Sequence, residues 1–331
     1  MDDRAFQAAK KIICCIHKDD VPEVQAVIRL LTPTLENFWR LMVAEAVVAL
    51  LDQLDQLGHK NGVPSVTALA RLDAREAQRR KEELIAALLS LLDTWTSRPP
   101  SSVGAGLVRS SIVSLLRDGA KANGEPLDLL REPLMTQAAM SDLLTLLRGR
   151  LELHKAELRD LLGRFLTTAG PRTPSASSLA GIASAAAGQA ALDRQGWIEA
   201  LKVALGSETA SWIPLVLDQW AYRWYNIGGF TASRQNGSLA FMAKAVRDNR
   251  TSAFCRWVDG RIVSVQKIQG QIDRHIRASL DGNLEAILTN WPMLTFKPTD
   301  GPAEFAMKFR SVGLPPYHPY CRTQAIPIRV G

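Results

Sequence analysis

The chain has 331 residues and a mass of 36.3 kDa, which is long enough for two domains of about 150 residues each. Apolar residues make up 47% of the sequence and charged residues 22%, and this balance excludes a wholly disordered or collagen-like chain. The sequence has no run of about 18 uncharged apolar residues, and its first residues lack the apolar core of a secretory signal. We therefore expect no membrane span. Four cysteines are too few for a disulfide scaffold and fit a reducing cytoplasm.

The net charge of +7 is unevenly distributed along the chain. The segment from Lys244 to Gly331 has 13 Lys and Arg against 7 Asp and Glu, whereas the rest of the chain has 27 against 26. A basic C-terminal part fits a polyanion or an acidic protein as partner. The sequence shows no Lys/Arg run and no aromatic-basic RNA motif. On charge alone we favour the simpler interpretation, a solvated surface with a modest excess of cations.

The first two-thirds of the chain are predicted to be helical almost throughout. Thr34 is expected to cap a helix that Gly58 ends. A second helix is predicted over residues 73–95, because Pro99-Pro100 cannot continue it. A shorter helix is predicted over residues 107–116.

A third long helix, with Ser141 as its expected cap, has the clearest pattern. Its apolar positions alternate at spacings of three and four: Leu144, Leu147, Leu151, His154, Leu158, Leu161 and Phe165. This heptad seam predicts lengthwise packing within a helical bundle, with self-association of two chains as the alternative. We interpret His154 as a core residue or a register device rather than a ligand.

Residues 167–190 are rich in Ala, Ser, Gly and Pro and contain few large apolar side chains. Such a segment gains too little from burial to offset the entropy of ordering, so it is predicted to be a flexible linker, with a helix in its Ala-rich second half as the alternative. The chain is thereby divided into a helical, bundle-like docking region at 1–166 and a C-terminal domain at 191–331.

The C-terminal part is predicted to be α+β, so the fold class is mainly α at the N-terminus with a C-terminal α+β domain. An aromatic-rich helix is expected over residues 212–226, ended by Gly228-Gly229. Asp259-Gly260 between two apolar runs predicts a β-hairpin, because a type I′ turn needs positive φ at both positions. Residues 323–330 alternate and predict a terminal strand, and Pro327 suits a sheet edge.

Two segments of the C-terminal part, residues 248–260 (DNRTSAFCRWVDG) and 315–322 (PPYHPYCR), carry a resemblance to a known family. Together with residues 218–237 before them, they resemble the phage Mu F-like head-morphogenesis family, the minor head proteins of tailed phages. The family has an Asp-x-Arg-Thr element, a Cys, a turn and then a PPxHPxCR element, in this order. The resemblance covers about residues 210–329, and residues 1–166 carry none of it.

The resemblance implies a set of structurally important residues: Asp248, Arg250, Thr251, Asp259, Gly260, Pro315, Pro316, Pro319 and Arg322. It also implies that Asp218 and Arg223 are approximate counterparts of a Glu and an Arg in the family. Where Ser252 stands the family often has Cys, which would complete a four-ligand set suited to zinc.

Three of the four ligands of this set are present in the chain: Cys255, His318 and Cys321. We expect them to lie together and to hold the predicted hairpin against the terminal strand. A metal-free structural cluster with no cofactor is the favoured interpretation. A weaker zinc site, with three protein ligands and water, is the alternative.

The resemblance implies a structural minor head protein that acts in head morphogenesis near the portal vertex of a tailed phage. Its location would be the virion head, and the host cytoplasm during assembly. Its partners would be portal or other head proteins, with packaged DNA a further contact. The sequence contains no signature of the common hydrolase, nucleotide-binding or metalloprotease sites, so we expect no enzyme. Two alternatives stay open: a nucleic-acid-binding protein outside a virion, and a toxin-type or metal-dependent enzyme that carries such a domain.

Overall fold

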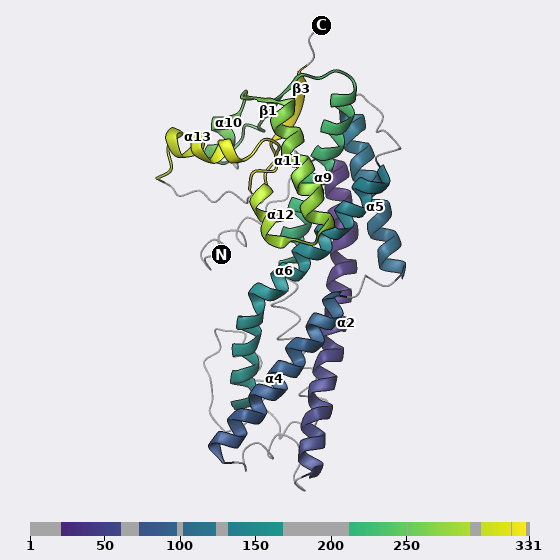
Figure 1. Ribbon diagram of the computed structural model, residues 1–331, viewed down its shortest axis with the longest axis vertical. Helices are drawn as coiled ribbons and strands as arrows, with labels where there is room; N and C mark the ends of the chain where they lie inside the picture. Colours follow the sequence, from purple (N-terminus) through teal and green to yellow (C-terminus); the bar gives the residue numbers. More distant parts are fainter. Residues whose placement is uncertain are drawn as a thin grey trace. The chain divides into compact units, whose positions relative to one another are not determined.

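The protein is described here from a computed structural model, shown in Figure 1. The structure describes residues 21–60, 73–97, 102–123, 132–167, 212–249, 251–291, 299–318 and 320–328. These residues form long helices followed by a C-terminal region in which short helices surround a three-stranded antiparallel sheet. The predicted fold class, mainly α with a C-terminal α+β region, is thereby confirmed.

The elements follow one another in a simple order. The long helices are α2 (Pro22–Lys60), α4 (Ala74–Ser97), α5 (Ser102–Ala122), α6 (Glu132–Thr167) and α9 (Ile213–Gln235). The remaining elements are β1 (Ala240–Lys244), α10 (Ala253–Val258), β2 (Ile262–Ser264), α11 (Val265–Leu280), α12 (Leu284–Asn290), α13 (Pro302–Ser311) and β3 (Gln324–Ile328).

The chain folds into two compact units that are each assembled from separate segments. One unit combines Met1–Thr32, Pro100–Leu146 and Pro214–Gly331, and the other combines Pro33–Pro99 and Leu147–Ile213. The first unit therefore joins helical segments that precede residue 166 to the C-terminal α+β region. The predicted linker at 167–190 lies outside the described residues, and the three-part division that depends on it stays a prediction.

Two predicted helix starts are wrong, because each helix begins about ten residues earlier. Helix α2 begins at Pro22 and contains Thr34 in its interior. Proline is well suited to the first turn, where its missing N–H has no partner to lose. Helix α6 begins at Glu132 and contains Ser141, whose hydroxyl donates a hydrogen bond to the carbonyl oxygen of Ser279. In both cases a residue with good capping chemistry lies inside a helix that packing extends.

The remaining bounds of the N-terminal helices agree with the predictions for α4 but not for α2 and α5. Helix α4 is confirmed, and Oδ1 of Asp73 accepts hydrogen bonds from the backbone amides of Arg75 at 3.0 Å and Glu76 at 2.9 Å. Gly58 lies inside α2, which ends at Lys60, and α5 extends beyond the predicted range on both sides. Most side chains of the predicted seam lie outside the described residues, namely those of Leu151, His154, Leu158, Leu161 and Phe165. The seam therefore stays a prediction.

Helix α9 runs through Gly228-Gly229 without a break, so the predicted end at residue 226 is wrong. The glycines allow close helix packing. A Cβ atom on Gly228 would lie 2.2 Å from the carbonyl oxygen of Leu116 in α5. A Cβ atom on Gly119 of α5 would lie 2.0 Å from the carbonyl oxygen of Tyr225. The two backbones therefore touch, and only glycine permits this crossing.

The small sheet has the strand order β2-β1-β3, with β1 antiparallel to both neighbours. Its inner face is formed by Phe241, Ala243 and Val263, which are all buried. The predicted terminal strand is confirmed as β3, and Pro327 lies on this edge strand as expected. Because β1 follows α9 directly, the sheet is fixed beside the buried helix through contacts such as that between Phe230 and Phe241.

The predicted hairpin around Asp259-Gly260 is wrong, because residues 253–258 form the short helix α10. Ser252 caps this helix with its hydroxyl, which accepts from the amide of Cys255 at 3.0 Å. Gly260 has the expected positive φ of 82°, but Asp259 has φ −55°, so the pair is not a type I′ turn. Instead Gly260 leaves the helix and donates to the carbonyl of Ala243 at 2.8 Å, which brings β2 against β1.

The glycine crossing predicts a sharp contrast between two Gly→Ala variants, measured as the free energy of unfolding in urea. Gly228→Ala should lose about 2 kcal/mol, because its Cβ meets backbone that cannot shift cheaply. Gly106→Ala in α5 is the matched control, because nothing lies within 4 Å of its Cβ. It should gain up to about 1 kcal/mol from helix propensity. Equal effects of the two variants would contradict the close crossing.

Candidate functional site

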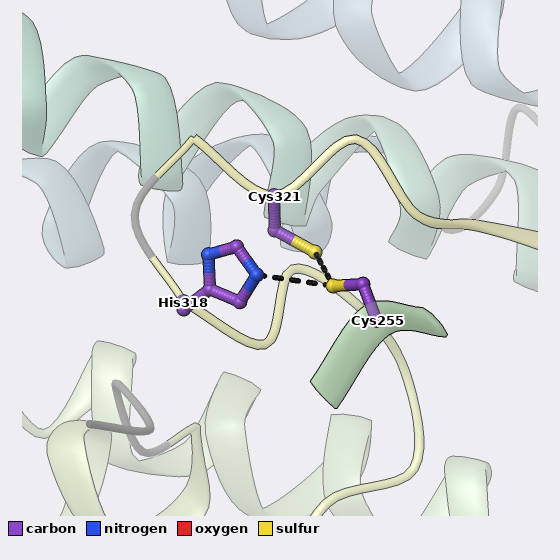
Figure 2. Close-up of side chains that lie close together, drawn as sticks. All are labelled: Cys255, His318 and Cys321. Atoms are coloured by element: carbon purple, nitrogen blue, oxygen red, sulfur yellow. Dashed lines mark hydrogen bonds between the residues drawn. The ribbon is translucent and has the colours of Figure 1, made fainter. Parts of the chain in front are cut away.

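Cys255, His318 and Cys321 lie together, as predicted, and form the Cys-His-Cys cluster shown in Figure 2. Cys255 belongs to α10, whereas His318 and Cys321 lie in the loop before β3. Sγ of Cys255 is 3.0 Å from Nε2 of His318 and 3.7 Å from Sγ of Cys321. The cluster therefore joins the terminal strand to a short helix, not to the arm of a hairpin.

Ser252 occupies the fourth side of the cluster. Its Oγ lies 3.0 Å from Nε2 of His318 while it also caps α10. The cap places Cys255 on the first turn of the helix, and the same hydroxyl positions the imidazole. Ser252 thus contributes a hydroxyl that forms hydrogen bonds here, and a hydroxyl is a poor zinc ligand beside thiolate.

The loop that carries His318 is held from two sides. The amide of Tyr320, which has φ 56°, donates to Oδ2 of Asp218 in α9 at 3.0 Å. The carbonyl of Pro316 accepts from Nε1 of Trp291 at 3.1 Å, and Pro315 and Pro316 are both buried. Pro319 lies outside the described residues. The loop is therefore a fixed platform for His318.

A salt bridge joins the two segments that carry the family resemblance. An Nη of Arg322 is 2.6 Å from Oδ1 of Asp248. Asp248 also closes the turn before α10, because its amide donates to Oγ1 of Thr251 at 3.0 Å and its Oδ1 accepts from the same hydroxyl at 3.0 Å. Arg250, which stands between these two residues in the sequence, lies outside the described residues.

Asp259 anchors the far end of α10. Its side chain is 3% exposed, and it accepts from the amide of Ala245 at 2.9 Å and from Nε of Arg247 at 2.6 Å. Asp259 and Gly260 thus connect the helix to the strand that precedes it. Both residues lie at the end of a helix, where the sequence predicted a hairpin turn.

The two thiols of the cluster have opposite pKa shifts. The hydrogen bond from the Cys321 thiol, with a further contribution from Ser252, outweighs burial and lowers the pKa of Cys255 to about 7. Burial raises the pKa of Cys321 well above its ordinary value, and its neighbour Cys255 adds to this effect. Near pH 7 the Cys255 thiol is therefore partly ionised, and its sulfur atom is accessible mainly to its own hydrogen-bond partners, since Cys255 is 3% exposed.

The geometry of the cluster is compatible with a metal ion. The ligand atoms of Cys255, His318 and Cys321 all lie within 4.8 Å of one another. Two thiolates on one tetrahedral zinc ion lie about 3.8 Å apart, because each Zn–S bond is about 2.3 Å long. The 3.7 Å between the two sulfur atoms matches this spacing. The 3.0 Å between Sγ of Cys255 and Nε2 of His318 is shorter than the distance of about 3.5 Å that a shared zinc ion would give, so a bound ion would need these two atoms to move apart. The same distances also suit hydrogen bonds in a metal-free cluster.

A second polar group, which sequence reasoning missed, lies in the core of the same unit. Asp142 of α6 is fully buried, and its carboxylate is 3.0 Å from an Nη of Arg223 in α9. It also accepts from Nε1 of Trp224 at 2.8 Å and lies 3.2 Å from Nε2 of His275 in α11. We call these four residues the Asp142 network. Arg223 was expected to matter as a family counterpart, but nothing in the sequence around Asp142 or His275 marks them as its partners.

The charges of the Asp142 network follow from its burial. Burial alone would raise the pKa of Asp142, but Arg223, His275 and Trp224 together lower it to about 2. Burial lowers the pKa of His275, and its carboxylate neighbour only partly opposes this effect. The network therefore holds one buried ion pair and a neutral imidazole at neutral pH.

Comparisons with known proteins give no relative: no protein-family model, curated protein or solved structure matches this chain.

Among the helices of the described residues, none is sufficiently long and apolar to cross a membrane.

The buried ion pair predicts a large effect of Asp142→Asn on the free energy of unfolding. The variant leaves the Arg223 guanidinium buried without a counter-charge, which should cost about 3–5 kcal/mol. Glu132→Gln is the matched control, because Glu132 lies on the same helix and pairs with Arg117, which is 55% exposed. This control should cost less than about 1 kcal/mol. Similar losses for both variants would contradict the assigned burial.

The lowered pKa values predict how stability depends on pH. Unfolded His275 takes up a proton near pH 6.5, whereas the folded residue resists it, so stability should fall as the pH drops below this value. Asp142 adds a second loss between about pH 4 and its folded pKa of about 2. Urea unfolding of wild type and His275→Gln at pH 7 and pH 5 provides the measurement. The wild type should lose up to about 1.4 kcal/mol per pH unit more than the variant, and parallel losses would rule out this assignment.

The packing of the Cys-His-Cys cluster predicts that Cys321→Ala is destabilising by about 1–3 kcal/mol. Cys321 is 1% exposed and contacts Cys255 within the aromatic core formed with Phe254 and Tyr317. Ser110→Ala on the exposed side of α5 is a suitable control and should change stability by less than about 0.5 kcal/mol. Thermal unfolding of the variants tests this, and an unchanged Cys321→Ala protein would show that the cluster does not stabilise the unit.

Proposed function

We propose that this chain is a structural minor head protein of a tailed phage, acting in head morphogenesis near the portal vertex. The observation that carries the proposal is the joining of the two segments on which the family resemblance rests. Asp248 pairs with Arg322 at 2.6 Å, and Cys255 contacts both His318 and Cys321. The two motif segments, which are far apart in the sequence, thus contact each other in one structural cluster. We expect such contacts if these motifs belong to one domain of the Mu F-like type.

The character of the cluster supports a structural role and not catalysis. Cys255 and Cys321 are 3% and 1% exposed, so neither sulfur atom is presented to a substrate. The surrounding residues serve to close turns, cap α10 and fix the loop before β3. A nucleophile needs both an activating base and access to the reacting atom. The proposal therefore assigns no reaction to this chain.

The cluster is proposed to hold the fold without a metal ion, with zinc as the alternative occupant. Its hydrogen bonds connect Cys255, His318, Cys321 and Ser252. If zinc organised the site instead, Cys255 and Cys321 would bind as thiolates with the neutral imidazole of His318, and the ion would add folding free energy. Because the hydroxyl of Ser252 is a poor zinc ligand, a water molecule would then take the fourth coordination position of the ion.

A chelator distinguishes these two versions. We expect that prolonged treatment with a strong zinc chelator leaves the thermal unfolding temperature of the full chain unchanged. The wild-type protein purified with and without added zinc serves as the comparison, with metal content measured by atomic emission. Unfolding by the chelator, together with one zinc per chain, would replace the metal-free version with a zinc-organised one.

The partners implied by this function are the portal or other head proteins, with packaged DNA as a further contact. The helical segments would provide docking surfaces. The surplus of Lys and Arg after residue 244 favours a location of the C-terminal region near a polyanion. The same surplus also favours the second candidate function, a nucleic-acid-binding protein outside a virion.

Purified phage particles provide the test of the proposed function. The phage or induced prophage that encodes this chain should yield particles in which mass spectrometry finds it at a fixed copy number. A density map of the vertex should place the chain beside the portal. A chain that is abundant in infected cells but absent from both particles and assembling heads would contradict the proposal. That result would favour the nucleic-acid-binding alternative.

A further inference from the structure

Two exposed cations lie on aromatic rings of α10 and α13. These two helices pack against each other (Figure 1). The guanidinium carbon of Arg261 is 3.5 Å from the ring centre of Trp257, and Nζ of Lys267 is 5.1 Å from the ring centre of Phe309. The two rings contact each other edge to face, with centroids 6.0 Å apart. We call these four residues the stacked-cation surface.

Each cation is fixed a second time by the backbone of the residue on which it stacks. Nε of Arg261 donates to the carbonyl of Trp257 at 3.1 Å, and Nζ of Lys267 donates to the carbonyl of Phe309 at 3.0 Å. The side chains are thus held in place before any partner arrives. Ordering two long side chains in advance removes part of the entropy cost of binding.

Neither cation has a carboxylate partner among the described residues. The acidic side chains of the neighbouring segments are already engaged: Asp259 with Arg247, Asp300 with Lys308, and Glu304 with the amide of Gly301. Fixed, exposed and uncompensated positive charge attracts an anionic ligand. The outer Nη groups of Arg261 keep their donors for it.

We propose that the stacked-cation surface binds the phosphate backbone of duplex DNA without regard to sequence. The arrangement favours phosphate over bases, because each ring already has a cation over one face and is packed against the core residue Phe254. Phosphate contacts of this kind position a protein on DNA but carry no sequence information. This inference rests on the DNA contact in the proposed function and identifies the residues that make it.

The test measures the affinity of the full chain for a random duplex of about 30 base pairs at several salt concentrations. The variant Arg261→Gln/Lys267→Gln should bind about tenfold more weakly, and its slope of log affinity against log salt should fall by about 1.8. The control variant Arg109→Gln/Arg277→Gln removes the same charge from exposed positions on α5 and α11. It should bind like the wild type. Circular dichroism and melting temperature verify that all three proteins are folded.

Three outcomes would overturn this inference. The first is equal weakening of both double variants, which would show that only net charge matters. The second is unchanged DNA binding by Arg261→Gln/Lys267→Gln. The third is displacement of DNA by polyglutamate at an equal concentration of charges, which would assign the surface to an acidic protein.

The fate of the proposed function can be followed separately, because incorporation into particles is measured by mass spectrometry. If Arg261→Gln/Lys267→Gln is incorporated like wild type and binds DNA normally, the surface assignment fails and the head-protein function stands. If the wild-type chain is absent from particles but its DNA binding needs both cations, the function fails and the surface assignment stands.

Discussion

The buried ion pair between Asp142 and Arg223 is the interaction on which the rest of the first compact unit depends. Both side chains are excluded from solvent, so neither charge can be left alone without a large desolvation cost. Asp142 belongs to α6, and its carboxylate contacts both Arg223 of α9 and His275 of α11. Arg223 and His275 also approach each other directly, at 3.5 Å. A helix from the N-terminal half and two from the C-terminal half are therefore fixed together by one charge. The glycine crossing of α5 and α9 adds a steric constraint to this electrostatic one.

The position of α9 determines the geometry of the Cys-His-Cys cluster. From this buried helix, Asp218 holds the amide of Tyr320, and Phe230 contacts Phe241 of β1. The loop before β3 is thereby held between α9 and the small sheet, and the imidazole of His318 points at Cys255. The cluster is therefore one of several contacts that join this loop to the rest of the unit, beside those of Tyr320 with Asp218 and of Pro316 with Trp291. This is consistent with a metal-free cluster that adds stability to an already assembled core.

The sequence predicted the residues of the cluster and the class of the fold, because these follow from motif order and from composition. It failed where a local signal depends on a distant neighbour. Gly228-Gly229 has the appearance of a helix end, but it serves a crossing with α5 that no local pattern reveals. Asp259-Gly260 has the composition of a hairpin turn, but residues 253–258 before it form a helix that Ser252 caps. Asp142 carries no motif at all, since its partner Arg223 is 81 residues away.

The central claim is that the C-terminal α+β region is completed by helical segments from before residue 146, through the Asp142 network and the glycine crossing. The most direct measurement compares the thermal unfolding of residues 212–331 expressed alone with that of the full chain. We predict that the isolated fragment shows no cooperative transition, because Arg223, Trp224 and the surface of α9 that faces α5 would be left without partners. A fragment that unfolds cooperatively at the same temperature as the full chain would contradict the account.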